Sequence, residues 1–141
     1  MALIYHPAPG SLVRVAFEPG FREPEMVKRR LCVVLSPAIV ARGKVLTVVA
    51  LSTTAPARRM PYHCEIEIPF DLPEGWSNRA WVKGDMVNAV GFHRTDLLHL
   101  GKDALGKRRY QVEVLPAATF RSVRQCVLHG MGLSRLTNLL D

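Results

Sequence analysis

The sequence predicts one mainly β domain, spanning residues 1–141, with a single helix near its C-terminal end. Two apolar runs, 31–36 and 45–52, are rich in β-branched residues and too short for helices, which is typical of buried strands. Only the segment 117–131 repeats apolar side chains at intervals of three and four residues. We therefore expect a strongly bent sheet or barrel of about five or six short strands, with the helix packed on it.

The first part of the chain holds one strand between turn signals. Residues 1–9 contain two prolines and should form an extended segment. Residues 11–17 alternate apolar side chains between two faces and are bounded by Pro-Gly pairs, as in a half-buried strand. The charged segment 18–30 has no helical period and contains two prolines and a glycine, so we expect a long, mobile loop.

The middle of the chain predicts two further strands. Residues 63–68 alternate in polarity, and Pro69 ends the pattern. Residues 71–78 carry a proline and a glycine and should form a loop. Residues 80–90 continue as a strand, in which Gly84 indicates a bulge or the close approach of another backbone segment.

The last part of the chain leads into the helix. Residues 95–100 are expected to form a short helical turn, and 101–109 a glycine-flanked basic hairpin or loop. Residues 110–115 alternate in polarity and predict another strand. Pro116 is a favourable residue at the start of the terminal helix.

The chain is basic. It has 19 lysines and arginines against 12 aspartates and glutamates, which gives a formal net charge of +7. An excess of positive charge favours a polyanionic partner, of which nucleic acid, RNA or DNA, is the first candidate. The alternative is a protein whose basic residues only solvate its surface.

Cysteines and histidines predict no metal, cofactor or disulfide framework. Cys32, Cys64 and Cys126 are odd in number, far apart and without C-x-x-C spacing. The five histidines show no metal-ligand spacing. We recognise no signal peptide and no apolar run of the ~18 residues that a membrane span needs, so we expect a cytoplasmic protein without membrane contact.

Polar side chains suited to phosphate chemistry flank the two buried runs. They are Lys28, Arg29 and Arg30 before the first run and Ser52, Thr53 and Thr54 after the second. A guanidinium stays charged and offers a planar fork of donors to phosphate oxygens. In RNA cleavage the 2′-hydroxyl attacks phosphorus, and a positioned guanidinium stabilises the charge that builds on the non-bridging oxygens. The alternative is that these residues are a solvated flank and ordinary strand terminators.

The order of motifs resembles the MazF/PemK family of toxin endoribonucleases. The resemblance is carried by KRRLCVVLSP at 28–37, VVALST at 48–53 and WVKGD at 81–85, and it extends from about Pro9 to Thr137. The stretches FREPEMVKRR, GKRRY and VLHGMGLSRLT resemble most closely the YifN-type PemK-like branch of this family.

The resemblance implies a small SH3-like β-barrel with a C-terminal helix, mainly β (α+β) in class. It also implies a homodimeric growth inhibitor, the toxin of a type II toxin–antitoxin system. Such a protein cuts single-stranded RNA without a metal ion and leaves 2′,3′-cyclic phosphate and 5′-hydroxyl ends. Its protein partner would be an antitoxin with an acidic tail, and the loop 18–28 would flank the RNA groove and receive the antitoxin's inhibitory segment.

The resemblance also implies which residues act. The catalytic arginine that opens the family's second strand matches Arg30, and the hydroxyl that closes its third strand matches Ser52, with Thr53 beside it. Asp85 is a third catalytic candidate, as general base for the 2′-hydroxyl or as the residue that orients Arg30, and a structural salt bridge is its alternative role. The predicted RNA contacts are Arg22, Lys28, Arg29, Thr54 and His63.

Departures from the family pattern leave other interpretations open. Leu31 stands where the family has proline, and Ser52 where threonine is commonest. A non-catalytic SH3-like nucleic-acid-binding module, or a domain whose basic groove holds an acidic antitoxin peptide, fits the same composition. Tyr62, Trp76 and Trp81 could stack on bases, although a tryptophan within a strand, such as Trp81, is more often a core residue.

Overall fold

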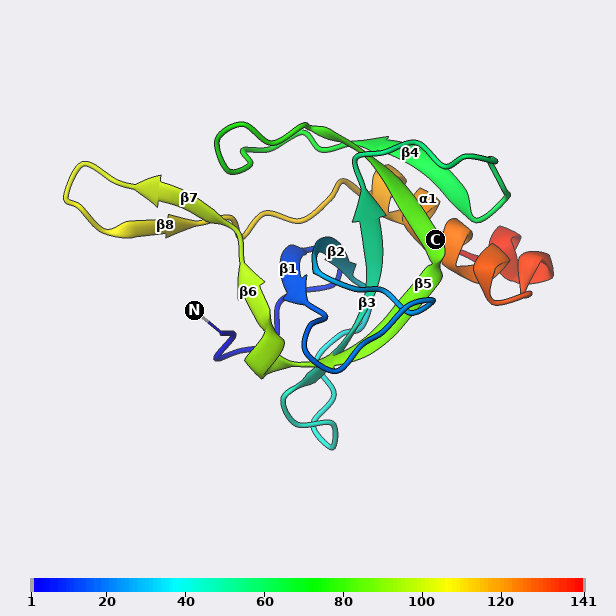
Figure 1. Ribbon diagram of the computed structural model, residues 1–141, viewed down its shortest axis with the longest axis horizontal. Helices are drawn as coiled ribbons and strands as arrows, with labels where there is room; N and C mark the ends of the chain where they lie inside the picture. The colour runs from blue at the N-terminus through cyan, green and yellow to red at the C-terminus, as the bar shows by residue number, and fades with distance from the viewer. Residues whose placement is uncertain (1, 141) are drawn as a thin grey trace.

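The computed structural model describes residues 2–140 and consists of a curved antiparallel sheet, a two-stranded hairpin and a C-terminal helix (Figure 1). The strands are β1 (Leu12–Ala16), β2 (Arg29–Val34), β3 (Val45–Ser52), β4 (His63–Glu67), β5 (Arg79–Gly91), β6 (Thr95–Leu97), β7 (His99–Lys102) and β8 (Arg108–Tyr110). The helical elements are α1 (Ala117–Gly130) and the short 3-10 helices η1 (Phe92–Arg94) and η2 (Ser134–Leu139). The mainly β class with a C-terminal helix is confirmed; residues 1 and 141 lie outside the described part of the chain.

Six strands form one sheet in the order β4-β5-β3-β2-β1-β6, and every neighbouring pair is antiparallel. The sheet bends strongly along β5, which is 13 residues long and pairs with both β3 and β4 (Figure 1). β4 and β6 are the two edges of this sheet and do not pair with each other within residues 2–140. The expected closed barrel is therefore an open, curved sheet.

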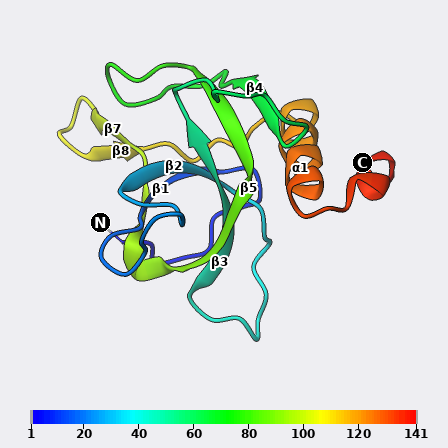
Figure 2. The same cartoon turned by 45° about the vertical axis from the view of Figure 1, so that its right-hand side comes forward.

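The two faces of the sheet carry separate apolar clusters. On one face, Val49 of β3 belongs to a cluster that includes Val123 and Cys126 of α1. Figure 2 shows α1 against the outer side of β5. The opposite face curves inward, where Val48 of β3 packs with Val15 of β1. The alternation of neighbouring residues in β3 thus assigns one face to the helix and the other to the inside of the curve.

A bulge in β5 brings the sheet into backbone contact with α1. Val49 pairs with Val87 but Ala50 pairs with Lys83, so residues 84–86 have no partner on β3. A Cβ atom added at Gly84 would collide with the backbone carbonyl of Cys126 in α1. The close backbone approach predicted at this glycine is confirmed, and the bulge rests directly on the helix.

The segment 95–100 is not the expected helical turn. It contributes to β6 and β7, because Thr95 and Leu97 pair with β1 at the edge of the sheet. The turn of 3-10 helix lies immediately before it, at Phe92–Arg94. The chain therefore forms eight strands within residues 2–140, more than the five or six predicted.

The basic segment 101–109 belongs to the predicted hairpin, formed by β7 and β8. The strand expected at 110–115 is wrong, because β8 ends at Tyr110 and the next side chain turns inward. That residue, the buried Gln111, donates through Nε2 to the carbonyl of Asp71 at 2.6 Å. The terminal helix α1 is confirmed, and none of the helices within residues 2–140 is long and apolar enough to cross a membrane.

Candidate functional site

Arg30 and Ser52 lie at the same end of two neighbouring strands. The last pair of the antiparallel β2–β3 ladder joins Cys32 to Ala50. Arg30 lies two residues before Cys32, and Ser52 lies two residues after Ala50. Because strand side chains alternate, the side chains of Arg30 and Ser52 lie on the same face of the sheet as those of Cys32 and Ala50. The ladder stops there, and the backbone opens between Arg30 and Ser52.

The same face continues onto β5 and β4. Ala50 pairs with Lys83 and Ser52 with Trp81 across the β3–β5 ladder. Lys83 in turn pairs with His63 at the start of β4. Cross-strand partners share a face, so a lysine, an indole and an imidazole lie beside Ser52.

These strand ends border an open surface cavity of about 450 Å³. It is lined by Ser52, Thr54, Ala55, Pro56, Ala57, Arg58, Tyr62, His63, Lys83, Asp85 and Met86. The cavity thus brings together four residues of the predicted site, namely Ser52, Thr54, His63 and Asp85. The others lie outside its lining: Arg22, Lys28, Arg29 and Thr53 are exposed, and Arg30 is half-buried.

Arg30 is oriented by the loop that precedes it. Its Nε donates to the carbonyl of Val27 at 3.1 Å. Among residues 2–140 this is the only hydrogen bond of the guanidinium, so both Nη atoms remain available to an anion. Burial raises the pKa of the neighbouring Cys32 thiol, and the positive charge of Arg30 opposes that shift in part.

The hydroxyl of Ser52 is engaged in a turn. Its Oγ accepts from the N–H of Thr54 at 3.1 Å and donates to the carbonyl of the same residue at 3.3 Å. These two bonds fix the position of Oγ at the end of β3. Donation to a phosphate oxygen would require the longer of the two bonds to break.

His63 presents a defined donor to the cavity. Its Nδ1 accepts from the backbone N–H of Met60 at 3.1 Å, so the neutral ring carries its proton on Nε2. The ring packs edge-on against Tyr62, with centroids 4.6 Å apart. A neutral imidazole held in this way leaves its Nε2–H available to donate to a ligand oxygen.

Asp85 lies in the β5 bulge, where its carboxylate is exposed. The bulge is held by the N–H of Gly84, which donates to the carbonyl of Tyr62 at 2.9 Å, and by α1 behind it. Within residues 2–140 the Asp85 carboxylate makes no ion pair or hydrogen bond, although Arg58 and Lys83 line the same cavity. The predicted orientation of Arg30 by Asp85 and the alternative structural salt bridge are both absent there.

Three functional candidates were missed by sequence reasoning. Arg58 and Lys83 line the cavity, and the Arg59 guanidinium lies 5.7 Å from the centroid of the Trp81 ring. Of the two roles open to Trp81, base stacking and the core, the core is the one that does not fit, because this residue is half-buried and pairs with Ser52. The Arg58-Arg59 pair, one residue after STTAP, is the signal that could have found them, since a basic pair near a predicted site suits phosphate binding.

The loop 18–28 is anchored at both ends. Phe21 packs edge-on against Phe17, with centroids 5.1 Å apart, and the Arg94 guanidinium lies 5.2 Å from the Phe21 ring. At its C-terminal end, the carbonyl of Lys28 accepts from the N–H of Phe17 at 2.8 Å. Lys28 has a φ of 69°, a left-handed conformation that bulky side chains seldom adopt and that is found at functional turns.

Among residues 2–140, no three His, Cys, Asp or Glu side chains are grouped as metal ligands would be. The groups that the site does offer are guanidinium, ammonium, imidazole, hydroxyl and carboxylate. These groups bind phosphates and transfer protons.

Comparisons with known proteins place the chain in a family. The family described as PemK-like, MazF-like toxin of type II toxin-antitoxin system matches residues 8–129. A search among curated protein sequences gives no match. The family match does not separate branches, so the YifN-type assignment stays a prediction.

Solved structures share the fold. MazF from Deinococcus radiodurans superposes with a TM-score of 0.60 at 23% identity, covering 91% of this chain and 98% of that one. An endoribonuclease in complex with its cognate antitoxin, from a mycobacterial species, gives 0.57 at 16% identity, covering 91% and 97%. MazF in the MazE–MazF complex from D. radiodurans gives 0.55 at 24% identity, covering 92% and 99%. The fold agrees with the family match over most of the sequence, and the chain belongs to the PemK-like, MazF-like toxins of type II toxin–antitoxin systems.

Proposed function

We propose that this chain is a toxin that cuts single-stranded RNA without a metal ion, leaving 2′,3′-cyclic phosphate and 5′-hydroxyl ends. The observation that carries the proposal is the shared face of Arg30, Ser52 and Lys83 at one open end of the sheet. The structural relatives described above include an endoribonuclease with its antitoxin and a MazE–MazF complex.

The proposed chemistry divides between a carboxylate and cations. The carboxylate of Asp85 takes the proton of the 2′-hydroxyl as that oxygen attacks the adjacent phosphorus. The bond to the 5′-oxygen breaks, and this oxygen leaves with a proton from solvent water. The Nη atoms of Arg30 and the ammonium of Lys83 stabilise the negative charge on the non-bridging oxygens.

The remaining predicted residues hold the strand. His63 donates from Nε2 to a phosphate oxygen, and Ser52 shapes the turn that presents Thr53 and Thr54. The exposed cations of the 18–28 loop and β2, Arg22, Lys28 and Arg29, attract the RNA backbone.

The proposal includes the partners. A cognate antitoxin with an acidic tail neutralises the toxin by covering the same cations, because a peptide of carboxylates competes with RNA for them. The active form is a homodimer in the cytoplasm. Analytical ultracentrifugation of the purified chain tests the dimer.

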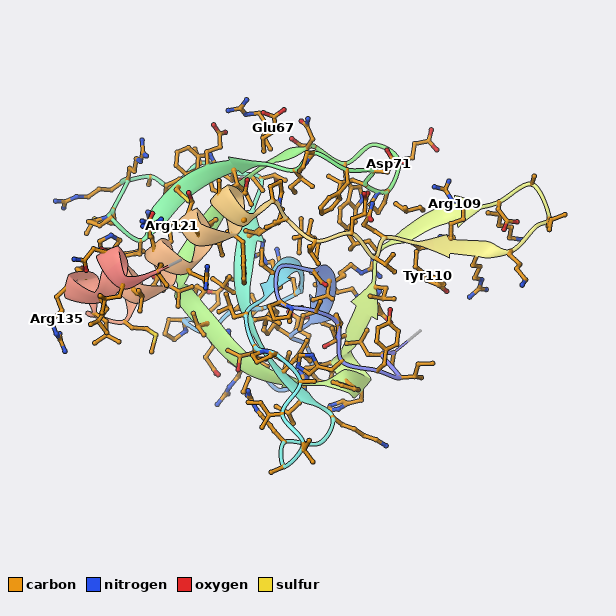
Figure 3. The ribbon with its side chains drawn as sticks, turned by 180° about the vertical axis from the view of Figure 1, so that it is seen from behind. Glu67, Asp71, Arg109, Tyr110, Arg121 and Arg135 are labelled. Atoms are coloured by element: carbon orange, nitrogen blue, oxygen red, sulfur yellow. The ribbon has the colours of Figure 1, made fainter. Side chains whose placement is uncertain are left out.

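RNA cleavage by the purified protein in EDTA tests the function. Arg30→Ala should lower the rate by about 100- to 1,000-fold, the usual effect of removing one transition-state donor. Arg135→Ala is the matched control, since this exposed arginine lies on η2, beyond α1 (Figure 3). Undiminished cleavage by the Arg30→Ala protein would remove Arg30 from the mechanism.

A non-catalytic nucleic-acid-binding module is the competing function. It is favoured by one observation, the engagement of the Ser52 hydroxyl in its own turn. It predicts salt-dependent RNA binding with no product in the same assay, whereas the toxin predicts binding and cleavage together.

A further inference from the structure

A second cavity of about 450 Å³ lies at the opposite edge of the sheet. It is bounded by the β7–β8 hairpin, by β6 and by the loop that connects β4 to β5, and it shares no lining residue with the first cavity. Figure 1 shows the hairpin and that loop projecting on the side of the sheet away from α1. The proposed cleavage chemistry does not use this cavity.

A bulge turns the polar side chains of the hairpin to one face. His99 pairs with Tyr110 and Lys102 with Arg108, so three steps along β7 match two along β8. Gly101 absorbs the additional residue with a φ of 91°, a conformation that favours glycine. Without the bulge, Lys102 would face away from His99, because strand side chains alternate.

This arrangement places two cations directly opposite each other. Lys102 and Arg108 are cross-strand partners, and like charges in that position destabilise a hairpin. Neither forms an ion pair within residues 2–140. Arg14 also lines the cavity, and Asp96, the one carboxylate of the lining, is its cross-strand neighbour. A bound anion would relieve the repulsion between the two cations. This relief matters because a two-stranded hairpin is only marginally stable by itself.

Aromatic rings complete the lining. Trp76 is 38% exposed, and its indole contributes to the cavity wall. The rings of His99 and Tyr110 form an edge-on pair with centroids 5.5 Å apart. Exposed indoles beside cations form the usual platform for a base and its phosphate.

We propose that this cavity binds one nucleotide, with the base stacked on Trp76 and the phosphate held by Lys102 and Arg108. The volume lies within the range of small-molecule sites. The same chemistry fits a nucleotide of the RNA substrate or a free mononucleotide. If the nucleotide belongs to the RNA substrate, the cavity is an accessory substrate site, and this assignment rests on the proposed function. If the nucleotide is free, the cavity is a separate ligand site.

Tryptophan fluorescence reads this cavity directly. The chain has two tryptophans, so Trp81→Phe leaves the emission of Trp76 alone. Titration with AMP or UMP should quench that emission saturably. The Lys102→Ala/Arg108→Ala double variant, in the same background, should weaken the apparent affinity by at least about 10-fold. Arg109→Ala is the matched control, since Arg109 and Tyr110 lie on opposite sides of β8 (Figure 3).

A second arm separates the two sources. Binding of a 2′-O-methyl RNA, which lacks the attacking hydroxyl, is measured by anisotropy for wild type, Trp76→Leu and the double variant. A loss of about 5- to 100-fold in RNA affinity on removing the indole assigns the site to the RNA. Mononucleotide quenching with unchanged RNA affinity assigns it to a free nucleotide.

Clear outcomes would overturn the proposal. If nucleotides cause no quenching and the variants leave RNA affinity unchanged, the proposal is refuted. Equal losses of affinity from Arg109→Ala and from the double variant would refute it as well. If an acidic peptide quenches the emission of Trp76 and no nucleotide does, the cavity is a protein contact and the proposal is wrong. Circular dichroism confirms that each variant is folded. These binding measurements need no cleavage. A wild-type protein that fails to cut RNA would therefore refute the proposed function, and the nucleotide-binding result could still be interpreted.

Discussion

The backbone contact between the β5 bulge and α1 can be tested by adding a single methyl group. Gly84→Ala places a Cβ against the Cys126 carbonyl and 2.8 Å from the carbonyl oxygen of Tyr62. Favourable contacts of carbon begin at about 3.5 Å, so the helix and the bulge must separate by about 1 Å. The φ of Gly84 is not in the left-handed region, so the contact is the sole reason for an effect.

The expected loss of stability follows from this overlap. Overpacking of a tight site costs about 2–3 kcal/mol, and the opposing groups here are backbone atoms that cannot rotate away. At about 3 °C per kcal/mol for a chain of this size, the Tm should fall by about 6–9 °C. Differential scanning calorimetry measures it. Gly43→Ala is the matched control, because nothing lies within 4 Å of its added Cβ.

The same substitution should impair cleavage in protein that remains folded. Asp85 follows Gly84 in the bulge, so a displacement of about 1 Å moves the proposed base relative to the phosphate and lowers the rate about 100-fold. Gly130→Ala crowds the same contact from the helix side, and the double variant should lose less than the sum of the singles. A Gly84→Ala protein with the Tm of the wild type would refute the tight contact between the β5 bulge and α1. A protein with a lowered Tm but full activity would refute the idea that this contact positions Asp85.

Three further predictions concern individual side chains. Asp85→Asn should lower the cleavage rate by at least about 100-fold, whereas the affinity for 2′-O-methyl RNA stays equal or rises, because a negative charge leaves a basic cavity; weaker binding at an unchanged rate would contradict the role of base. Trp81→Leu should lower RNA affinity by about 5- to 100-fold in an anisotropy titration, and an unchanged affinity would return the indole to a structural role. The neighbouring Cys126 thiol lowers the pKa of the Cys64 thiol, so iodoacetamide should modify Cys64 at lower pH than an ordinary thiol. Cys126→Ala removes that thiol, should raise the pKa of Cys64 and should slow its modification at neutral pH, as mass spectrometry can show; an unchanged rate would exclude an effect of Cys126 on Cys64.

The strands that carry the first cavity follow from local patterns. The runs at 31–36 and 45–52 overlap β2 and β3, and the helical period at 117–131 matches α1. Burial on both faces makes a strand apolar throughout, and burial of one stripe gives a helix its period, so the sequence contains both signals. Antiparallel pairing of the two runs then suffices to bring Arg30 near Ser52.

The face of Trp81 could not be predicted in the same way. Val82 and Val87 both belong to the helix-side cluster, although they are an odd number of positions apart and would face opposite sides of a regular strand. The three unpaired residues at the bulge reverse the alternation, so Trp81 lies on the face of its partner Ser52 while Val82 faces α1. Gly84 indicates that β5 contains a bulge, but the number of unpaired residues in the bulge depends on how closely α1 packs against it. That contact is tertiary and leaves no local pattern.

The position after Arg30 bears most directly on the proposed chemistry. A proline there restricts the preceding residue to extended backbone, and Leu31 imposes no such restriction. Arg30 is instead kept extended by pairing with Val15 of β1, and its Nε is held by the carbonyl of Val27. Leu31 also packs against the helix-side cluster, so an apolar contact fills the position. The direction of the guanidinium therefore depends on the 18–28 loop, and any ligand that moves this loop, whether RNA or an acidic peptide, also moves Arg30.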